Sequence, residues 1–293
     1  MNILYNEPMS RHTTLRVGGP ADRFVLVDTL EEFGQILSGC RRSRASHAVI
    51  GRGSNLLVSD DGFRGTVICT AGGFSDIRII DTKGDDVTLF AEAGATLTAL
   101  ASFALQQGLT GFEFAAGIPG TVGGGVIMNA GAFGGEFGNL IREVRLFDES
   151  GEKITMLRED MGFGYRTSRI KGTQLVVTGA VLTLQKGEPT AIKSKMEDLA
   201  RERSAKQPLD FASAGSTWKR PEGNFAAKLI DEAGCRGLTF GGARISEKHA
   251  GFLINTGRAD AEDVTSLMRI VEERVYESSG IHLEPEIVKI GFD

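Results

Sequence analysis

The alternation of hydrophobic and polar residues predicts short strands around one helix in the first part of the chain. Residues 29–42, TLEEFGQILSGCRR, carry hydrophobic positions at helical spacing, with Thr29 as the expected N-cap and Glu32 placed to complete a capping box. Period-two and β-branched runs predict strands in DRFVLV, HAVIG, NLLVS and GTVICT. We therefore expect a small α/β subdomain over residues 1–70.

Strands dominate the next part of the chain, residues 71–187. Apolar and alternating runs predict them in DIRIID, VTLFAEA, EVRLFD, KITML and QLVVTGAVLTL. One helical pattern, TLTALASFALQQG, interrupts the strands and is followed by a long glycine-rich segment. These residues are expected to form a second subdomain.

A charged helical pattern, GEPTAIKSKMEDLARERSAKQP, marks the start of a third domain over residues 188–293. Helix and strand signals alternate after it, and the last strand is predicted in EPEIVKI. In AEDVTSLMRIVEERVYESSG, hydrophobic residues recur at helical spacing, which predicts one buried face made of Val264, Leu267, Met268, Val271 and Val275. The third domain is thus expected to be a compact α/β unit.

Glycine is the compositional outlier, at 39 of 293 residues, about 13% against a usual figure of roughly 7%. Two long clusters lie beside predicted strands, GRGSNLLV from residue 51 and AGIPGTVGGGVIMNAGAFGG from residue 116. A single glycine pair would indicate a tight turn, but clusters that bracket aliphatic residues favour a ligand, because glycine lets backbone N–H groups approach an anion closely. No GxGxxG opens a helix after a strand and no P-loop motif occurs, so a diphosphate ligand is expected outside those two folds.

The rest of the composition is that of an ordinary globular protein, with 41% hydrophobic and 24% charged residues. A net charge of −5 without a Lys/Arg-rich run argues against nucleic acid as a partner. No segment approaches the roughly 20 apolar residues of a membrane helix, and the first residues lack the apolar core of a secretory signal. Three isolated cysteines, Cys40, Cys69 and Cys235, predict reduced thiols, no metal site and a cytoplasmic location.

The order of several motifs resembles the MurB family, the UDP-N-acetylenolpyruvoylglucosamine reductases of peptidoglycan synthesis. Besides the two glycine loops, the resemblance rests on HTTLRVGGPADRFV, GYRTSR, SAGSTWKRPEGNFAAKLIDEAG, SEKHAGFLIN and LEPEIVKIG, which follow one another in the family's order along nearly the whole chain. It implies an α+β fold: a two-subdomain FAD-binding fold of the vanillyl-alcohol-oxidase (PCMH) type, followed by a C-terminal α/β substrate-binding domain.

The resemblance also implies FAD as the cofactor. Neither glycine loop contains a histidine or cysteine, so the FAD is expected to be bound non-covalently. The expected contacts in the first loop are Gly51, Gly53, Ser54, Asn55 and Leu56. Those in the second loop are Gly117, Pro119, Gly120, Gly123, Gly124, Asn129, Ala130 and Gly131.

The reaction that the resemblance implies is the reduction of UDP-N-acetylglucosamine enolpyruvate to UDP-N-acetylmuramate. NADPH, a co-substrate, reduces the FAD, and flavin N5 then delivers hydride to C3 of the enolpyruvyl group. Charge develops toward the substrate carboxylate as an enolate, and C2 takes a proton. The protein must therefore supply a cation, a proton donor and a group beside the enolate.

Three residues match the family's catalytic positions. Arg166 in GYRTSR would face the substrate carboxylate, because a guanidinium binds a carboxylate in a bidentate manner. Ser216 in SAGSTW would give the proton to C2, although most serines in such a run are turn or N-cap residues. Glu286 in LEPEIVKI would stabilise the enolate beside Arg166.

The choice of Glu286 over Glu284 rests on a strand that the sequence predicts. In an extended strand Glu286 shares a face with Val288 and Ile290, which favours its burial. Glu284 points the same way two residues earlier and stays a rival.

The substrate's nucleotide and sugar require further contacts. The expected ones are Tyr165, Lys206, Arg220 and Lys228, with Lys219 and Arg244 as weaker alternatives.

His249 is interpreted as a structural histidine beside the GFLIN strand. Trp218 stands where the family usually has phenylalanine and is expected to alter the substrate pocket. The chain is expected to be of the family's shorter type, which lacks an extra loop and insertion, and to be a monomer.

Two other classes of function compete with the reductase. One is a flavin oxidase of the same fold that uses oxygen as acceptor, and the other is a nucleotide-sugar-binding protein that has lost catalysis. The presence of Arg166, Ser216 and Glu286 together disfavours both.

Overall fold

The computed structural model describes residues 1–292, which form two compact units. The first unit contains residues 1–4, 24–52 and 66–203, and the second contains residues 5–23, 53–65 and 204–293. This division falls within three strands and near the end of one long helix, and it does not follow the three sequence ranges expected above. Whether those ranges act as separate functional domains stays a prediction.

One mixed sheet has the order β1-β2-β5-β3. Its strands are β1 (Asn2–Pro8), β2 (Pro20–Leu26), β5 (Phe63–Cys69) and β3 (His47–Ile50). Helix α1 (Leu30–Arg42) connects β2 to β3, and the parallel pairing of β3 with β5 places Ile50, the last residue before the first glycine loop, opposite Cys69. Thr29 caps α1 as expected, its side chain accepting the N–H of Glu32. The predicted capping box is wrong in its second half, because Glu32 accepts the N–H of Asp28 and not that of Thr29.

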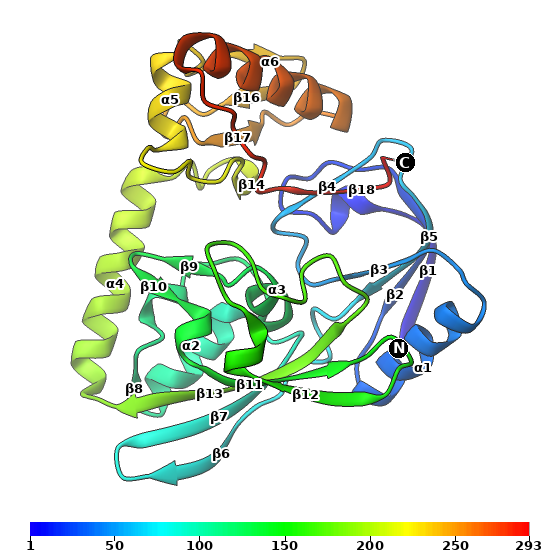
Figure 1. Cartoon of the computed structure of the whole chain (residues 1–293), viewed down its shortest axis with the longest axis vertical. Helices are drawn as coiled ribbons and strands as arrows, with labels where there is room; N and C mark the ends of the chain where they lie inside the picture. The colour runs from blue at the N-terminus through cyan, green and yellow to red at the C-terminus, as the bar shows by residue number, and fades with distance from the viewer. Residues whose placement is uncertain (293) are drawn as a thin grey trace. The chain divides into compact units, whose positions relative to one another are not determined.

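A larger sheet forms the core of the first unit, in the order β12-β11-β13-β7-β6 with β8 beside β13 (Figure 1). The strands are β6 (Ile77–Lys83), β7 (Asp86–Glu92), β8 (Leu109–Thr110), β11 (Ile141–Phe147), β12 (Lys153–Leu157) and β13 (Val176–Lys186). The predicted strands of this region are confirmed. Helix α3 (Val122–Ile127) packs on β13, and helix α2 (Leu97–Gln106) follows β7.

The first unit also contains short elements, the 3-10 helices η2 (Glu113–Ala115), η3 (Phe137–Asn139) and η4 (Arg158–Met161) and the two-stranded pair β9 (Gly131–Ala132) and β10 (Gly135–Glu136). The 3-10 helix η1 (Met9–Arg11) belongs to the second unit. Helix α4 (Pro189–Lys206) is the predicted charged helix, and its only fully buried residue is Ile192.

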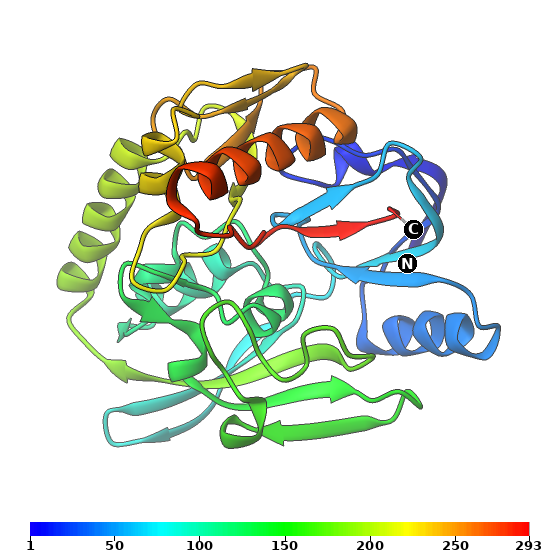
Figure 2. The same ribbon diagram turned by 45° about the horizontal axis from the view of Figure 1, so that its top comes forward.

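The second unit is built on a four-stranded sheet in the order β14-β17-β16-β15. Its strands are β14 (Ala212–Ser216), β15 (Thr239–Phe240), β16 (Ala243–Ile245) and β17 (Phe252–Asn255). Helices α5 (Ala226–Glu232) and α6 (Ala261–Ser279) pack together with it, as Figure 2 shows for the long α6. The predicted apolar stripe of α6 is confirmed, since its five residues are all buried.

The last strand, β18 (Val288–Ile290), pairs in parallel with β4 (Leu56–Val58), directly after the first glycine loop. The same region holds the start of α6: Asp60 accepts the N–H of Ala261 at 2.8 and 3.0 Å and that of Glu262 at 3.0 Å. An anionic oxygen at a helix N-terminus satisfies N–H groups that have no partner inside the helix. Asp60 therefore ties the segment after the glycine loop to the largest helix of the second unit.

We expect Asp60→Ala to lower the free energy of unfolding by about 1–2 kcal/mol, the usual effect of losing a helix-capping acceptor. Thermal unfolding of the FAD-bound protein measures the change. Asp61→Ala is the matched control, since Asp61 is the neighbouring carboxylate and is not the acceptor at this helix. Equal shifts for the two variants would contradict the capping role.

Candidate functional site

The second glycine segment is attached to the first unit through its backbone. The N–H of Val122 donates to Ala95 O at 2.8 Å and that of Gly123 donates to Ala93 O at 2.9 Å. Thr121 caps the helix that follows, its Oγ1 accepting the N–H of Gly124 at 3.4 Å. A Cβ on Gly123 would lie only 3.2 Å from the Cβ of Ala93, so part of the glycine content is a packing requirement.

Three glycines of the predicted contacts have no room for a side chain. A Cβ on Gly51 would lie 2.2 Å from Thr121 Oγ1, and one on Gly131 would lie 2.7 Å from Gly135 O. Gly53 has φ +60°, and its Cβ would lie 2.1 Å from His12 O. Protein packing alone explains these three residues.

Gly124 differs from them. It is exposed, and a Cβ there would meet only Thr121 Oγ1, at 3.8 Å. Glycine in a helix costs about 0.5–1 kcal/mol relative to alanine, and nothing in the protein itself requires it at this position. A ligand lying against the first turn of α3 would require it.

Several predicted contacts of the glycine loops are open enough to meet a ligand. Gly117, Pro119 and Gly124 are exposed, and a further set is half-buried: Ser54, Asn55, Leu56, Gly120, Ala130 and Gly131. Gly53, Gly123 and Asn129 are buried. The exposed and half-buried backbone could hold a cofactor, whereas the buried residues shape the loops.

Asn55 has a role that the sequence did not reveal. Its Nδ2 donates to Glu286 O at 3.0 Å, and its backbone carbonyl accepts the N–H of Val288 at 2.9 Å. Asn55, in the first glycine loop, therefore holds the segment that carries Glu286, the predicted catalytic glutamate. The signal in the sequence was only the asparagine itself, since its partner lies more than 200 residues away.

Arg166 lies in a two-residue turn of the first unit. Gly164 and Thr167 exchange backbone hydrogen bonds of 3.1 and 3.2 Å around it. Arg166 has φ +53°, a left-handed conformation that costs a non-glycine residue about 1–3 kcal/mol. Its Nη2 donates to Gly131 O at 3.0 Å, so the predicted catalytic arginine contacts the second glycine segment directly.

Tyr165 precedes Arg166 in the same turn. Its side chain is 48% exposed, and the Arg166 guanidinium lies 5.1 Å from the centre of its ring. The turn therefore presents an aromatic ring and a cation side by side, as a substrate with a carboxylate would need.

Ser216 and Glu286 lie on neighbouring segments of the second unit. Ser216 ends β14 opposite Phe252 of β17. The N–H of Glu286 donates to Thr217 O at 2.8 Å, and the N–H of Lys219 donates to Glu284 O at 2.8 Å. These antiparallel bonds bring the residue after Ser216 against Glu286, and both predicted residues are half-buried.

The strand predicted around Glu286 is wrong in its extent. The chain bends at Ile287, and the strand begins only at Val288. The bend reverses the predicted faces, so that Ile287 is 6% exposed and Val288 is 36% exposed. Glu284, the rival, is 69% exposed and forms an ion pair with Lys219. Glu286 is thus the more enclosed carboxylate, for a reason other than strand alternation.

The predicted substrate cations lie on the surface of the second unit. Arg220 stacks over Phe225, with 4.4 Å from its guanidinium carbon to the ring centre, and Lys228 pairs with Glu232 at 3.7 Å. Lys206 is the exposed last residue of α4. No feature of these three residues separates a substrate contact from an ordinary surface cation.

Trp218 is a core residue, and its expected effect on the substrate pocket stays a prediction. Its side chain is 2% exposed in the core of the second unit, and its Nε1 donates to Glu272 Oε1 at 2.8 Å. His249 is structural, as expected: its Nδ1 accepts the N–H of Gly251 at 3.1 Å, and burial lowers its pKa.

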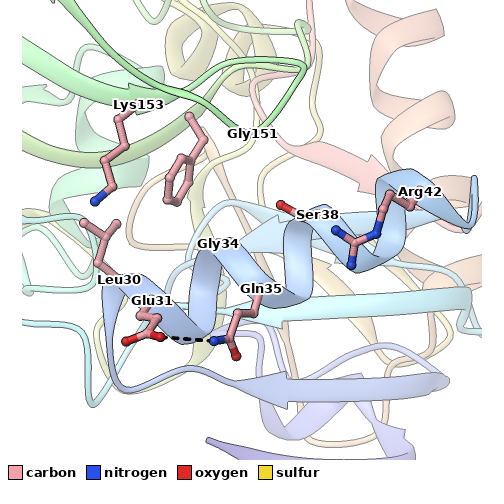
Figure 3. Close-up of a pocket in the computed structure, with 9 residues that line it drawn as sticks. Leu30, Glu31, Gly34, Gln35, Ser38, Arg42, Gly151 and Lys153 are labelled. Atoms are coloured by element: carbon pink, nitrogen blue, oxygen red, sulfur yellow. Dashed lines mark hydrogen bonds between the residues drawn. The ribbon is translucent and has the colours of Figure 1, made fainter.

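Two cavities of the first unit lie away from most of these residues. One of about 650 Å³ lies between α1 and the β11–β12 connection and is lined by Glu31, Gln35, Arg42 and Lys153, among others (Figure 3). Glu31 accepts a hydrogen bond from Gln35 there, and no predicted site residue lines the cavity. A smaller one, of about 330 Å³, reaches only Gly117 of the predicted contacts.

Among residues 1–292, no helix combines the length and apolar character that a membrane crossing requires. In the same part of the chain, no group of three or more His, Cys, Asp or Glu side chains is arranged to hold a metal ion.

Comparison with known proteins identifies the two parts of the chain. A family model described as FAD binding domain matches residues 21–156, and one described as UDP-N-acetylenolpyruvoylglucosamine reductase, C-terminal domain, matches residues 207–290. The predicted FAD-binding fold and its cofactor are thereby confirmed.

Full-length relatives agree with this identification. The UDP-N-acetylenolpyruvoylglucosamine reductase of Clostridioides difficile is 46% identical over 100% of this chain and 94% of its own length. The crystal structure of MurB from Thermus caldophilus matches with a TM-score of 0.81 at 37% identity, over 99% of this chain and 98% of that one. A cholesterol oxidase from Brevibacterium sterolicum, at 15% identity and a TM-score of 0.50 over 63% of this chain and 38% of that one, shares the fold alone. The chain therefore belongs to the UDP-N-acetylenolpyruvoylglucosamine reductase (MurB) family.

Proposed function

We propose that this chain performs its family's reaction with Arg166, Ser216 and Glu286 as catalytic residues. The enzyme is an FAD-containing oxidoreductase, a UDP-N-acetylmuramate dehydrogenase of peptidoglycan precursor synthesis. Its substrate is UDP-N-acetylglucosamine enolpyruvate, and NADPH is the reductant. The observation that carries the residue assignment is the pair of backbone bonds that set the segments of Ser216 and Glu286 side by side.

Each glycine loop by itself has features that suit FAD. In the first unit, the exposed Gly124 leaves room against the first turn of α3, and the half-buried Gly120 and Ala130 offer backbone groups. In the second unit, the half-buried backbone of Ser54 offers N–H and carbonyl groups. When bound, FAD takes a hydride from NADPH and supplies it to the double bond of the substrate. The protein's part is to bind and orient the substrate, to stabilise its charge and to supply a proton.

Arg166 binds the substrate carboxylate and stabilises the negative charge that develops there. A guanidinium presents its N–H donors in a planar fork that matches the geometry of a carboxylate. The strained turn that carries it is typical of residues whose position matters for function. Tyr165 lines the same turn and contacts the substrate beside it.

Ser216 supplies the proton to C2, and Glu286 stabilises the resulting acid-enolate. A hydroxyl is a weak acid in water, so its position against the basic carbon is what makes it effective. The bond from Glu286 N–H to Thr217 O fixes that position relative to the carboxylate segment. Lys206, Arg220 and Lys228 would bind the diphosphate and sugar. The enzyme is proposed to be a cytoplasmic monomer of the family's shorter type.

The other two hypotheses are disfavoured by the family match over the whole chain. The cholesterol oxidase, at 15% identity, is similar to this chain in fold alone and does not support an oxidase activity. A binding protein without catalysis would have no use for Ser216 and Glu286 on adjacent segments.

Gly124→Ala should weaken FAD binding by roughly tenfold or more without destabilising the FAD-free protein. The new Cβ has ordinary contacts within the protein and improves the helix by up to about 1 kcal/mol, but it fills the space against the cofactor. FAD titration followed by fluorescence, with thermal unfolding of the apoprotein, measures both effects. Unchanged FAD affinity would remove Gly124 from the cofactor site.

Ser216→Ala should reduce the rate of substrate reduction by about 10²–10⁴-fold, the usual contribution of a positioned proton donor. Reduction of FAD by NADPH should keep its rate, since that step needs no proton from Ser216. Stopped-flow absorbance separates the two half-reactions. Normal turnover of the variant would eliminate this residue as the donor.

Glu286→Gln should slow the same substrate half-reaction by about tenfold or more, because an amide stabilises the acid-enolate less well than a carboxyl group. Glu284→Gln is the matched control, two residues away, and should change the rate by less than about twofold, since an exposed ion pair contributes little. The reverse order of effects would assign the role to Glu284.

A further inference from the structure

The side chain of Asn129 is wholly engaged within the protein. It is 2% exposed, and its Oδ1 accepts the N–H of Gly138 at 2.8 Å. Its Nδ2 donates to Gly164 O at 3.0 Å and to Glu136 Oε2 at 3.1 Å. An amide nitrogen has two N–H donors, and both are used. The Asn129 side chain therefore has no donor left for the cofactor that the sequence assigned to it.

These bonds converge on the turn that carries Arg166. The side chain of Asn129 donates a hydrogen bond to Gly164 O, two residues before Arg166. The side chain of Arg166 in turn donates to Gly131 O, two residues after Asn129. Ser168 Oγ donates to Ile127 O at 2.8 Å, which adds a third attachment beyond the turn. Hydrogen bonds between residues 127–131 and residues 164–168 thus hold the turn both before and after Arg166.

The partners of Asn129 fix the orientation of its amide. Gly164 O and the Glu136 carboxylate only accept hydrogen bonds, whereas the N–H of Gly138 only donates. In an Asn129→Asp variant, a carboxylate oxygen would replace the Nδ2 donor and would lie against two hydrogen-bond acceptors, Gly164 O and the Glu136 carboxylate. Asn129 itself has φ +43°, and Arg166 has φ +53°, so two left-handed residues are held by one network.

We propose that Asn129 is a positioning residue that holds the Tyr165–Arg166 turn in the strained conformation that directs Arg166 to the substrate carboxylate. The inference rests on the proposed role of Arg166. The second glycine loop would then have two roles. It would bind the cofactor, and it would also hold Arg166 in position for the substrate carboxylate.

Asn129→Asp tests the inference, because it changes hydrogen-bond donors while it keeps the shape. Oxidation of the reduced enzyme by the enolpyruvyl substrate should slow by about 10²-fold, the usual effect of a catalytic group displaced by about 1 Å. The FAD dissociation constant and the rate of reduction by NADPH should change by less than about threefold, since neither depends on Arg166. The flavin absorption spectrum should be unchanged.

Two companion variants separate a specific effect from a general one. Glu136→Gln in the Asn129→Asp background restores a donor facing the new carboxylate and should recover about tenfold of the lost rate. Asn139→Asp makes the same chemical change at an exposed asparagine ten residues later and should alter the rate by less than about twofold.

Arg166→Ala, measured in parallel, separates the proposed role of Arg166 from the inference on Asn129. If Asn129 acts through Arg166, adding Asn129→Asp to Arg166→Ala should cause little further loss. A normal substrate rate in Arg166→Ala would overturn the proposed role of Arg166. A slow Arg166→Ala with a normal Asn129→Asp would overturn only the inference on Asn129.

Loss of FAD from Asn129→Asp, or equal slowing of both half-reactions, would also overturn the inference and assign Asn129 to the cofactor or to general loop structure. If Asn129→Asp does not fold, Ser168→Ala replaces it, since it removes another attachment of the same turn. It should slow the substrate half-reaction by about three- to tenfold and leave reduction by NADPH unchanged.

Discussion

The arrangement of the first unit depends on backbone contacts of the second glycine segment. Val122 and Gly123 donate their N–H groups to the Ala95 and Ala93 carbonyls, and Gly51 lies against Thr121 with no room for a Cβ. These contacts fix the second glycine segment on the edge of the β7–α2 connection. Because Arg166 bonds to Gly131 of that segment, the placement of this arginine, the proposed cation of the site, follows from the same backbone packing.

An asparagine in each glycine loop joins that loop to a segment that carries a proposed catalytic residue. Asn129 bonds to the turn of Arg166 in the first unit, and Asn55 bonds to the backbone of Glu286 in the second. Both were predicted from sequence as cofactor contacts, and both side chains bond to protein backbone. The amide suits this task because it carries both hydrogen-bond donors and an acceptor, so it can join segments that are far apart in the sequence.

The second unit is held by contacts between segments far apart in sequence. The β4–β18 pairing joins residues 56–58 to 288–290, and Asp60 joins the same early segment to α6. Glu286 lies between two of these attachments, the bond from its N–H to Thr217 and the bond from Asn55 to its carbonyl. These two bonds fix the backbone of Glu286 on both sides and so limit where its carboxylate can lie.

The sequence by itself determined the periodic elements, the family and the residue types that the reaction needs. The strands of the large sheet and the buried stripe of α6 followed from local hydrophobic spacing, and the FAD-binding fold followed from motifs in order. Only the tertiary structure decided what Asn55, Asn129 and Trp218 do, and where the last strand begins. Local patterns record which residues alternate or cap, but a hydrogen bond between residues 55 and 286 depends on how the whole chain brings them together. For that reason the family's motifs predicted candidate site residues from the sequence, whereas the hydrogen bonds that hold their segments in place were found only in the structure.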